Sequence, residues 1–312
     1  MRTAALLFAT CLAACSPGTD PETAEDTGDA EDPWFTLLVI PDTQYLTLNP
    51  EYGMLETMME WILDNHEALN IKMVLQEGDL THNNTDAEWA EADAGFSMLD
   101  GVVPYAVCVG NHDMEGNDPS QRDTTRFNQV FGLERWRQTQ TFYASASETR
   151  ADDHAHVFTA GGVDWMVLSL AYDPTDQALG WAEELVGNHP EHSIIVLTHA
   201  YLAPSASVSS EGRGIRDRIV DPYPNVEFVL NGHFIGSTNA DRRRERADGS
   251  EVLEVFSNYQ DMLLGGFGRM RQMRIEPAAG TIDVVTCNAY SECSEDEGDT
   301  LTFADLELGS NP

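Results

Sequence analysis

Five short segments of this chain place side chains that can bind metal ions directly after apolar runs. In chain order they are Asp42-Thr43-Gln44, Gly78-Asp79, Gly110-Asn111-His112-Asp113, Thr198-His199 and Gly232-His233. The preceding runs, each typical of a buried strand, are Phe35 to Ile40, Ile71 to Leu75, Val102 to Val109, Ile194 to Leu197 and Val226 to Leu230. Carboxylate, amide and imidazole groups are ligands of divalent metals. Because the ends of parallel strands meet at one edge of a sheet, the sequence predicts a metal centre there.

The order of the expected elements favours an α/β fold. Helices expected over Glu51 to Leu69 and Asp86 to Asp100, the latter with Asp86 as N-cap, separate the first three strands, which is typical of a parallel sheet covered by helices. The later elements expected are strands at Thr141 to Ala146, His154 to Thr159, Val163 to Ala171, Val252 to Phe256, Gly268 to Ile275 and Thr281 to Thr286, and helices at Asp176 to Val186 and Ile215 to Val220. We therefore expect one domain over residues 34–312, an α+β four-layer sandwich of two facing mixed β-sheets flanked by helices.

The first 33 residues differ from the rest of the chain. Arg2, the apolar stretch Ala4 to Ala14 and the sequence Leu12-Ala13-Ala14-Cys15 resemble a bacterial lipoprotein signal peptide over residues 1–14, with lipid on the Cys15 thiol. The alternative assignments of this segment are a plain secretory signal peptide and a short membrane anchor. Residues 15–33 hold seven acidic residues, no basic residue and no aromatic residue, which predicts a disordered tether. Together these features predict a lipid-anchored protein of the cell envelope, at the periplasmic face or the outer membrane.

Charge and cysteine content narrow the expected partners. The formal net charge of −36 disfavours nucleic-acid backbones and anionic membrane surfaces, which leaves the lipid anchor as the expected membrane link. Cys287 and Cys293 lie close together in sequence and are candidates for a disulfide in an oxidising compartment. Cys108 lies in an apolar run and is expected to be a buried free thiol.

The five segments, in this order and with Gly-Asn-His-Asp in the middle, resemble the calcineurin-like metallophosphoesterases. The first motif Pro41-Asp42-Thr43-Gln44, the segment Phe256-Ser-Asn-Tyr-Gln260, Gly265-Gly266 and Arg269 to Ile275 resemble a bacterial subgroup of that family. The resemblance spans Trp34 to Asp305. It implies hydrolysis of a phosphate mono- or diester by in-line attack of a metal-bound hydroxide, with one or two divalent ions (Mn, Fe, Zn, Mg or Ca) as cofactors. The implied substrate is a phosphorylated small molecule or a lipid headgroup.

The resemblance also implies a role for each ligand residue. Asp79 would bridge two metal ions, and Asp42 would be the carboxylate of the first. Asn111, His199 and His233 would complete the second metal position. Paired cations of this kind activate water and stabilise charge on the attacking and leaving oxygens.

The implied proton donor is a histidine. His112 would contact the phosphate and protonate the leaving oxygen, a task suited to an imidazole near neutral pH. Asp113 would orient the imidazole of His112.

Two positions depart from the family pattern. Gln44 and Ile235 stand where the family usually has imidazole ligands of the first metal. Gln44 is a weaker, neutral oxygen ligand and Ile235 cannot coordinate, so the first position should favour oxygen-preferring ions. The alternative is a catalytically degenerate member that binds one metal and serves as an envelope binding or scaffold protein.

Several further residues allow two interpretations. His82 is either a support of the metal ligands or a surface histidine. The group Arg242, Arg243, Arg244 and Arg246 is either an anion clamp or a solvated hairpin. Tyr45 and Tyr201 either line the site or are ordinary packing residues. The segment Leu202 to Arg213 is expected to be a mobile loop beside the site.

No His-Glu-x-x-His or Gly-x-Ser-x-Gly pattern is present in the sequence, which argues against a peptidase.

Overall fold

The first buried strand shows how the layers form, because its side chains alternate between two hydrophobic cores. Phe35, Leu37 and Val39 belong to one core, whereas Leu38 and Ile40 belong to another. Successive strand residues point to opposite faces of a sheet, so a strand with apolar residues on both faces must be covered on both sides. The computed structural model describes residues 32–236, 239–294 and 300–309. The expected signal peptide over 1–14, Cys15 and most of the tether lie outside the described residues.

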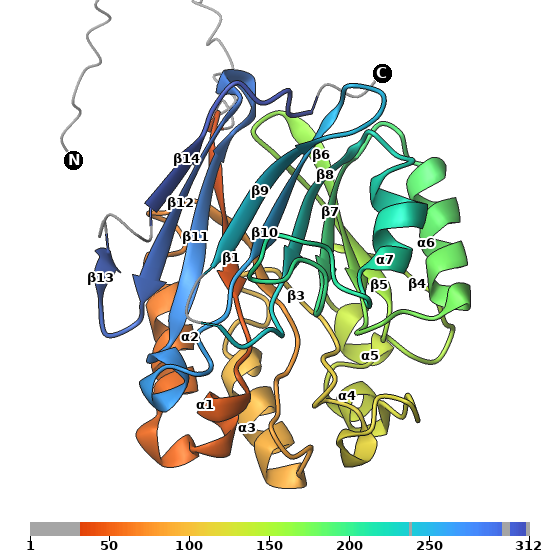
Figure 1. Ribbon diagram of the computed structural model, residues 1–312. Coiled ribbons are helices and arrows are strands. Elements are labelled where there is room, and N and C mark those ends of the chain that lie inside the picture. The colour runs from red at the N-terminus through yellow and green to blue at the C-terminus, as the bar shows by residue number, and fades with distance from the viewer. Residues whose placement is uncertain (1–31, 237–238, 295–299, 310–312) are drawn as a thin grey trace, which may run out of the picture. The chain divides into compact units, whose positions relative to one another are not determined.

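Strands and helices follow one another along the described chain (Figure 1). The strands are β1 (Phe35–Ile40), β2 (Ile71–Gln76), β3 (Tyr105–Val107), β4 (Phe142–Ser145), β5 (His154–Ala160), β6 (Val163–Leu170), β7 (Ser193–Thr198), β8 (Val226–Asn231), β9 (Ala240–Glu245), β10 (Glu251–Phe256), β11 (Arg269–Glu276), β12 (Thr281–Asn288), β13 (Ser291–Ser294) and β14 (Thr300–Phe303). The helices are α1 (Gln44–Leu48), α2 (Met54–Asn65), α3 (Asp86–Ser97), α4 (Thr125–Val130), α5 (Leu133–Trp136), α6 (Asp176–Gly187) and α7 (Arg213–Ile215). Short helical turns are η1 (Pro50–Tyr52), η2 (Glu115–Asn117), η3 (Arg216–Val220), η4 (Leu263–Gly266) and η5 (Pro277–Ala279).

The strands form two mixed sheets. The β1 sheet has the order β13-β12-β11-β1-β2-β3, with β14 beside β12, and the β7 sheet has the order β4-β5-β6-β7-β8-β10-β9. In the β1 sheet, β1, β2 and β3 are parallel and β11 runs antiparallel to β1. In the β7 sheet, β6, β7, β8 and β10 are parallel. The parallel strands therefore bring their carboxyl ends together, as the sequence predicts.

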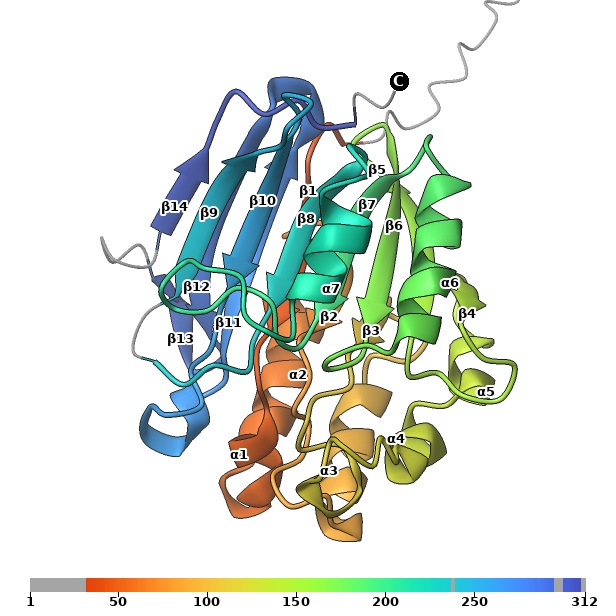
Figure 2. The ribbon, with the colours of Figure 1, turned by 45° about the vertical axis from the view of Figure 1, so that its right-hand side comes forward.

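Three hydrophobic cores separate four layers. The core between the sheets contains inward-facing residues of both, such as Leu37 of β1 and Leu197 of β7. A second core packs α2 to α5 on the β1 sheet, and a third packs α6, α7 and η3 on the β7 sheet. Figure 2 shows α6 and α7 covering β6, β7 and β8. The expected fold class, two facing mixed sheets flanked by helices, is confirmed.

Some local expectations differ from the structure. The third strand, expected over 102–109, is limited to β3, and the sequence patterns do not predict α1, α4, α5 or β9. Asp86 is not the N-cap of α3: the hydroxyl of Thr85 accepts from the Glu88 N–H, and the Glu88 carboxylate accepts from the Thr85 N–H. This reciprocal capping box satisfies two backbone donors at once, which a single Asp cap does not.

The structure tests part of what the sequence predicts for the cysteines. Cys108 is a buried free thiol, as expected, and burial raises its pKa. Cys287 takes part in a disulfide bond. The side chain of its expected partner, Cys293, lies outside those described, so that pairing stays a prediction. Among the described residues, no helix combines the length and apolar character needed to cross a membrane.

Two buried histidines predict acid sensitivity of the fold. His154 stacks on Trp136 with ring centroids 5.3 Å apart, and His156 meets the same ring edge-on at 5.3 Å. Burial lowers the pKa of His154 to about 4, and burial with the neighbouring His154 lowers the pKa of His156 well below 6.5. Below pH 6.5 the unfolded chain therefore binds protons that the folded chain does not. Stability should fall between pH 6.5 and 4, by up to about 1.4 kcal/mol per pH unit for each ring.

The substitution His156→Phe tests this prediction. It keeps an aromatic ring against Trp136 and removes one titrating group. We expect the urea midpoint of the variant to fall less steeply with acidification than that of the wild type. Carboxylates titrate in both proteins, so the difference isolates the imidazole. Equal slopes would contradict the assignment.

Candidate metal centre

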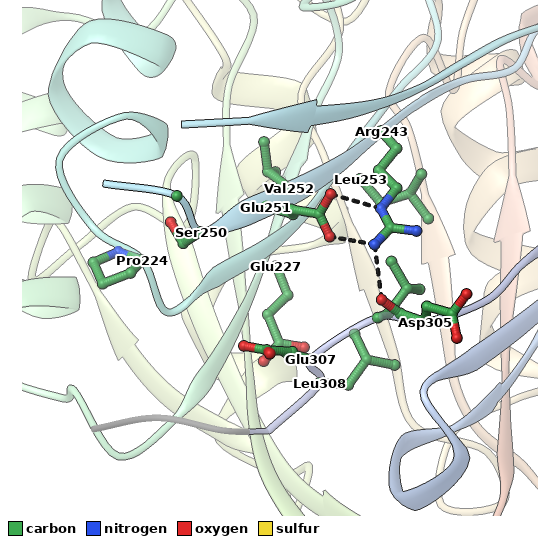
Figure 3. Close-up of a pocket in the computed structure, with 12 residues that line it drawn as sticks. Pro224, Glu227, Arg243, Ser250, Glu251, Val252, Leu253, Asp305, Glu307 and Leu308 are labelled. Carbon is green, nitrogen blue, oxygen red and sulfur yellow. Dashed lines mark hydrogen bonds and ion pairs between the residues drawn. The ribbon is translucent and has the colours of Figure 1, made fainter. Parts of the chain in front are cut away.

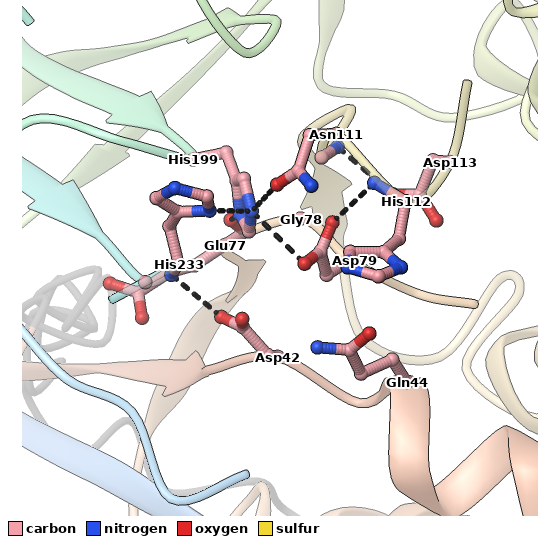
Figure 4. A network of polar contacts seen from close by, with 12 residues as sticks. Asp42, Gln44, Glu77, Gly78, Asp79, Asn111, His112, Asp113, His199 and His233 are labelled. Atoms are coloured by element: carbon pink, nitrogen blue, oxygen red, sulfur yellow. Dashed lines mark hydrogen bonds and ion pairs between the residues drawn. The ribbon is translucent and has the colours of Figure 1, made fainter. Parts of the chain in front are cut away.

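The five predicted segments meet at the carboxyl ends of the parallel strands. Asp42 follows β1, Asp79 follows β2, Asn111 follows β3, His199 follows β7 and His233 follows β8 (Figure 4). Two of these residues have left-handed backbones, with φ of 50° at Asp79 and 74° at His233. Such conformations are unfavourable for residues with a side chain and persist where the surrounding structure enforces them.

Four ligand atoms converge on one point. The Nε2 atom of His199 lies 3.1 Å from Oδ1 of Asn111, 3.1 Å from Nδ1 of His233 and 3.2 Å from Oδ2 of Asp79. The ligand atoms of Asp79, His199 and His233 all lie within 4.8 Å of one another. The other ring nitrogen of His199, Nδ1, donates to the Glu77 carbonyl at 2.8 Å, which fixes the tautomer that directs Nε2 into the cluster. Two imidazoles, a carboxylate and an amide oxygen are a ligand set for a divalent cation.

Electrostatics at this cluster favour a positive charge. Burial alone would lower the pKa of His199, but the Asp79 and Asp42 carboxylates raise it to about 10. Burial would likewise raise the pKa of Asp79, yet the contact with His199 lowers it overall. At His233, burial and the nearby His199 lower the pKa to about 4, so this ring is neutral at pH 7. Since metal binding displaces protons from imidazole, these carboxylates can stabilise either a proton or a metal ion.

The expected first-metal position is built from oxygen and amide groups. Oδ1 of Asp42 accepts from the His233 N–H at 3.0 Å, and Oδ2 accepts from the amides of Asn258 at 3.0 Å and Gln260 at 3.1 Å. The side-chain amide of Gln44 donates to Oε1 of Gln260. Burial raises the pKa of Asp42 to about 7, with Asp79 adding repulsion and His199 opposing it. Donors from three directions thus offset part of the cost of burying this carboxylate.

Ile235 leaves this position without an imidazole from its segment. Its side chain is 70% exposed and therefore contributes no contact to the centre. His82 approaches instead: its Nδ1 lies 3.0 Å from Oε1 of Gln44, and its half-buried ring stacks on His112 with centroids 5.3 Å apart. Of the two interpretations of His82, the structure favours support of the site over a surface histidine.

His112 lies beside the cluster, but its orientation has a different origin from the one expected. Its backbone N–H donates to Oδ1 of Asp79 at 2.9 Å, and its Nδ1 lies 2.7 Å from the carbonyl of His82. The carboxylate of Asp113, expected to orient the ring, accepts instead from the N–H groups of Gly110 and Thr81 at 2.9 and 3.0 Å. Asp113 therefore fixes the loops that carry Asp79 and Asn111, because its carboxylate is directed at their backbone.

The sequence pattern of the family described as Calcineurin-like phosphoesterase matches residues 35–235. This chain belongs to that family. The match includes every strand end that supplies a predicted ligand. Membership supports metal-dependent hydrolysis of a phosphoester as the general class of activity.

Individual proteins are also similar to this chain. It is 31% identical over 262 residues to the uncharacterized protein YvnB of Bacillus subtilis (strain 168), covering 82% of this chain and 20% of that protein. The chain thus spans about one-fifth of the length of this relative. Among solved structures, it is similar to the purple acid phosphatase PPD1 of yellow lupin (Lupinus luteus), with a TM-score of 0.54, 13% identity and coverage of 87% and 54% of the two chains.

Two further structures share the fold at low identity. A dimetal phosphatase from Danio rerio has a TM-score of 0.52 and 12% identity, covering 86% of this chain and 98% of that chain. GAP50, the anchor in the inner membrane complex of Plasmodium, has a TM-score of 0.54 and 9% identity, covering 87% and 88%. At such identities the likeness establishes the fold of this chain and nothing finer.

Three residues at the candidate centre are not predicted from the sequence. Asn258 and Gln260, which bind Asp42, follow β10, and the ring of Tyr172 lies 5.2 Å from that of His233. The segment Phe256 to Gln260 carries a subgroup resemblance, but its amides have no recognisable ligand spacing. A polar Ser-Asn-Tyr-Gln run directly after an apolar strand is the available signal.

The group Arg242, Arg243, Arg244 and Arg246 is not a clamp at the candidate metal centre. Arg242 and Arg244 form ion pairs with the buried Glu254, and Arg243 pairs with Glu251. Arg246 is buried, and its guanidinium donates to carbonyls of Val220, Val226 and Glu251. Since these guanidinium groups are occupied by the protein itself, the anion-clamp interpretation is wrong. The solvated-hairpin interpretation is also wrong in part, because Arg242, Arg243 and Arg244 lie in the strand β9 and Arg246 is buried.

Tyr45 and Tyr201, for which the sequence allows two interpretations, have different surroundings. Tyr45 packs against the His82 ring with centroids 4.9 Å apart, so it lies at the centre. The hydroxyl of Tyr201 is buried and donates to Glu254 at 2.8 Å, which makes Tyr201 a packing residue.

Proposed function

We propose that this chain hydrolyses a phosphate monoester or diester at the cluster formed by Asp79, Asn111, His199 and His233, with His112 as the proton donor. The observation that carries the proposal is the convergence of three ligand atoms within 3.2 Å of His199 Nε2. Two imidazole nitrogens 3.1 Å apart in a buried site repel each other unless a cation, either a proton or a metal ion, lies between them.

The residues present fit a divalent metal ion. Asp79, Asn111, His199 and His233 would hold it, and Asp79 would share a second ion with Asp42 and Gln44. Bound cations would supply activation of water and stabilisation of charge on the phosphate oxygens. The second position mixes nitrogen and oxygen ligands, whereas the first offers oxygens only, so a hard ion such as Mn²⁺, Mg²⁺ or Ca²⁺ should bind there more weakly.

His112 is positioned to hold and donate a proton. The carbonyl of His82 is an acceptor only, so the Nδ1 of His112 must carry a hydrogen to bind it at 2.7 Å. Nε2 is therefore the ring nitrogen left to face a substrate. When both ring nitrogens are protonated, Nε2 can deliver its proton to the leaving oxygen. The stack with the His82 ring and the N–H contact to Asp79 hold the ring next to the metal ligands.

Metal content and turnover test the proposal together. Protein expressed without residues 1–33 should bind one to two equivalents of divalent metal and hydrolyse p-nitrophenyl phosphate or its bis-p-nitrophenyl analogue. The variant His199→Ala should lose both properties, whereas Tyr143→Phe, remote from the centre, should keep both. Absence of hydrolysis with Mn, Fe, Zn, Mg and Ca in turn would overturn the proposal.

A binding or scaffold role is the second candidate, and the exposure of Ile235 favours it. The first position lacks two imidazoles, and a protein of the same fold, GAP50, is described as a membrane-complex anchor. One tightly bound metal with no turnover would support this role. Retention of His112 beside the cluster favours catalysis, because a scaffold has no use for a proton donor there.

Repairing the first position should strengthen metal binding there. Gln44 is buried beside Asp42 and His82, so Gln44→His places an imidazole where an oxygen ligand now lies. We expect a higher affinity for a second Zn²⁺ or Mn²⁺ equivalent, by about 10-fold or more, measured by competition with a chromogenic chelator. The matched control Ile235→His should show no gain, because side chain 235 points to solvent. An equal gain in both variants would contradict this placement.

We further propose that the chain is a lipid-anchored envelope protein. The support is the sequence of residues 1–15 and the acidic composition of residues 15–33. Metabolic labelling with radioactive palmitate should mark the wild type and not the variant Cys15→Ser. Labelling of both proteins would refute attachment at Cys15.

A further inference from the structure

The carboxyl end of β6 brings a tyrosine to the metal ligands of the β7 sheet. β6 runs parallel to β7 and ends at Leu170, and Tyr172 lies just beyond that end. The centroid of its ring lies 5.2 Å from that of His233 and 5.9 Å from that of His199. These are distances of packed ring pairs, so the phenol lies against both imidazoles of the candidate metal centre.

The backbone of Tyr172 is held by two distant parts of the chain. Its N–H donates to the carbonyl of Val109 at 2.8 Å, and its own carbonyl accepts from Nη2 of Arg122 at 3.1 Å. Nη1 of the same guanidinium donates to the carbonyl of Asp173 at 2.8 Å. Arg122 has a left-handed backbone with φ of 51°, which is unfavourable for an arginine and persists where the surrounding structure enforces it. The position of Tyr172 beside the imidazoles is therefore strongly specified.

The hydroxyl of Tyr172 is left free for a ligand. The residue is half-buried, yet its hydroxyl has no hydrogen-bond partner among the described residues, whereas that of Tyr201 donates to Glu254 at 2.8 Å. Burial raises the pKa of Tyr172, and nearby carboxylates, that of Asp79 among them, raise it further. An ordinary tyrosine is already uncharged at pH 7. The group is therefore an O–H donor within electrostatic reach of the ligand cluster.

A phosphate at this centre needs hydrogen-bond donors, because negative charge lies on its non-bridging oxygens and shifts among them during transfer. The arginines of β9 do not supply these donors. Arg243, for example, forms a forked ion pair with Glu251 and donates to the Asp305 carbonyl (Figure 3). The Nη atoms of Arg122 are directed at backbone carbonyls. The hydroxyl of Tyr172, by contrast, is a donor beside the cluster that the protein itself does not use.

We propose that the hydroxyl of Tyr172 donates a hydrogen bond to a non-bridging oxygen of the substrate phosphate. The inference rests on the proposed hydrolase function and adds a substrate contact to it. The backbone of His112 binds Oδ1 of Asp79, whereas His199 approaches Oδ2 of the same carboxylate (Figure 4). Tyr172 lies on the His199 side, so it and His112 would bind the phosphate from two sides of Asp79.

The substitution Tyr172→Phe tests this contact in the full chain. It keeps the ring against the imidazoles and removes only the hydroxyl, so the urea midpoint and the metal content should match those of the wild type. Isothermal titration of inorganic phosphate into the Mn²⁺-loaded protein should show binding weaker by about 10-fold, the effect of one hydrogen bond to a charged group. On p-nitrophenyl phosphate, kcat/KM should fall by about 10- to 100-fold.

Tyr143→Phe is the matched control, because it also removes one phenol hydroxyl, which lies on the edge strand β4 and contacts Nε2 of His189 at 2.6 Å. It should bind phosphate as the wild type does. Absence of phosphate binding by the loaded wild type, equal affinity of Tyr172→Phe and the wild type, or an equal decrease in both variants would overturn the proposal. Loss of metal from Tyr172→Phe would also overturn it, since the tyrosine would then support the ligands. Phosphate titration needs no turnover, so a wild type that binds phosphate without hydrolysing esters would refute the hydrolase proposal alone.

Discussion

The variant His112→Ala should lose about 10²- to 10⁴-fold in kcat on phosphate esters with poor leaving groups, while its metal content stays unchanged. The His112 side chain contacts the His82 carbonyl and ring and contributes no atom to the convergent ligand cluster. Its removal therefore takes away a proton donor and leaves the metal ligands in place. The measurement is steady-state hydrolysis of phenyl phosphate together with metal analysis.

The leaving group supplies the internal control for this prediction. p-Nitrophenolate departs without a proton, so the loss on p-nitrophenyl phosphate should be much smaller than the loss on phenyl phosphate. The control His192→Ala, just before the start of β7 and so at the far end of that strand from His199, should match the wild type on both substrates. Equal losses on the two esters, or a loss of metal, would assign His112 a structural role.

The variant Gly110→Ala should disable the metal centre and destabilise the fold. A Cβ at this position would lie 2.1 Å from the backbone nitrogen of Asp79 and 2.2 Å from its Oδ1 atom. Backbone cannot swing aside as a flexible side chain can, so the loop that carries Asp79 must move. Overpacking of this kind costs about 1–3 kcal/mol, and the displaced carboxylate should abolish stoichiometric metal binding.

Urea unfolding and metal analysis test this second prediction, with Gly180→Ala as the control. In α6 the nearest atom to a Cβ at Gly180 is Nη2 of Arg218 at 3.6 Å, an ordinary contact. Alanine is favoured over glycine in a helix, so the control should be more stable by about 0.5–1 kcal/mol and keep its metal. A Gly110→Ala protein with full metal content would show that the loop is more adaptable than the contacts indicate.

Strands and their ends are predictable from the sequence because a strand that is buried on both faces appears as a short, mostly apolar run. Runs such as Phe35 to Ile40 are mostly apolar and are buried at every position, and the polar residues that follow them lie at the sheet edge. The same local logic fails for the start of α3, where Thr85 and Asp86 are both acceptable caps. The choice depends on a reciprocal contact with Glu88.

Roles that depend on long-range contacts are not accessible from local pattern. Asp113 follows His112 in sequence, but its carboxylate is directed at the backbone of Gly110 and Thr81. Four arginines in five positions look like one cluster, yet strand alternation sends them to different partners, Glu254 for Arg242 and Arg244 and Glu251 for Arg243. Side-chain direction in a strand follows the pleat, which a charge count does not record.

Local sequence is enough to predict that the five segments meet, because each apolar run is followed by a residue that can bind a metal and parallel strands deliver their ends to one edge. The surroundings of those ligands depend instead on tertiary packing. Asn258 and Gln260 bind Asp42 across 216 and 218 residues of chain, and Ile235 turns to solvent. Strand periodicity is a property of a few neighbouring residues, whereas these contacts follow from sheet order and register, which are set by packing across the whole domain.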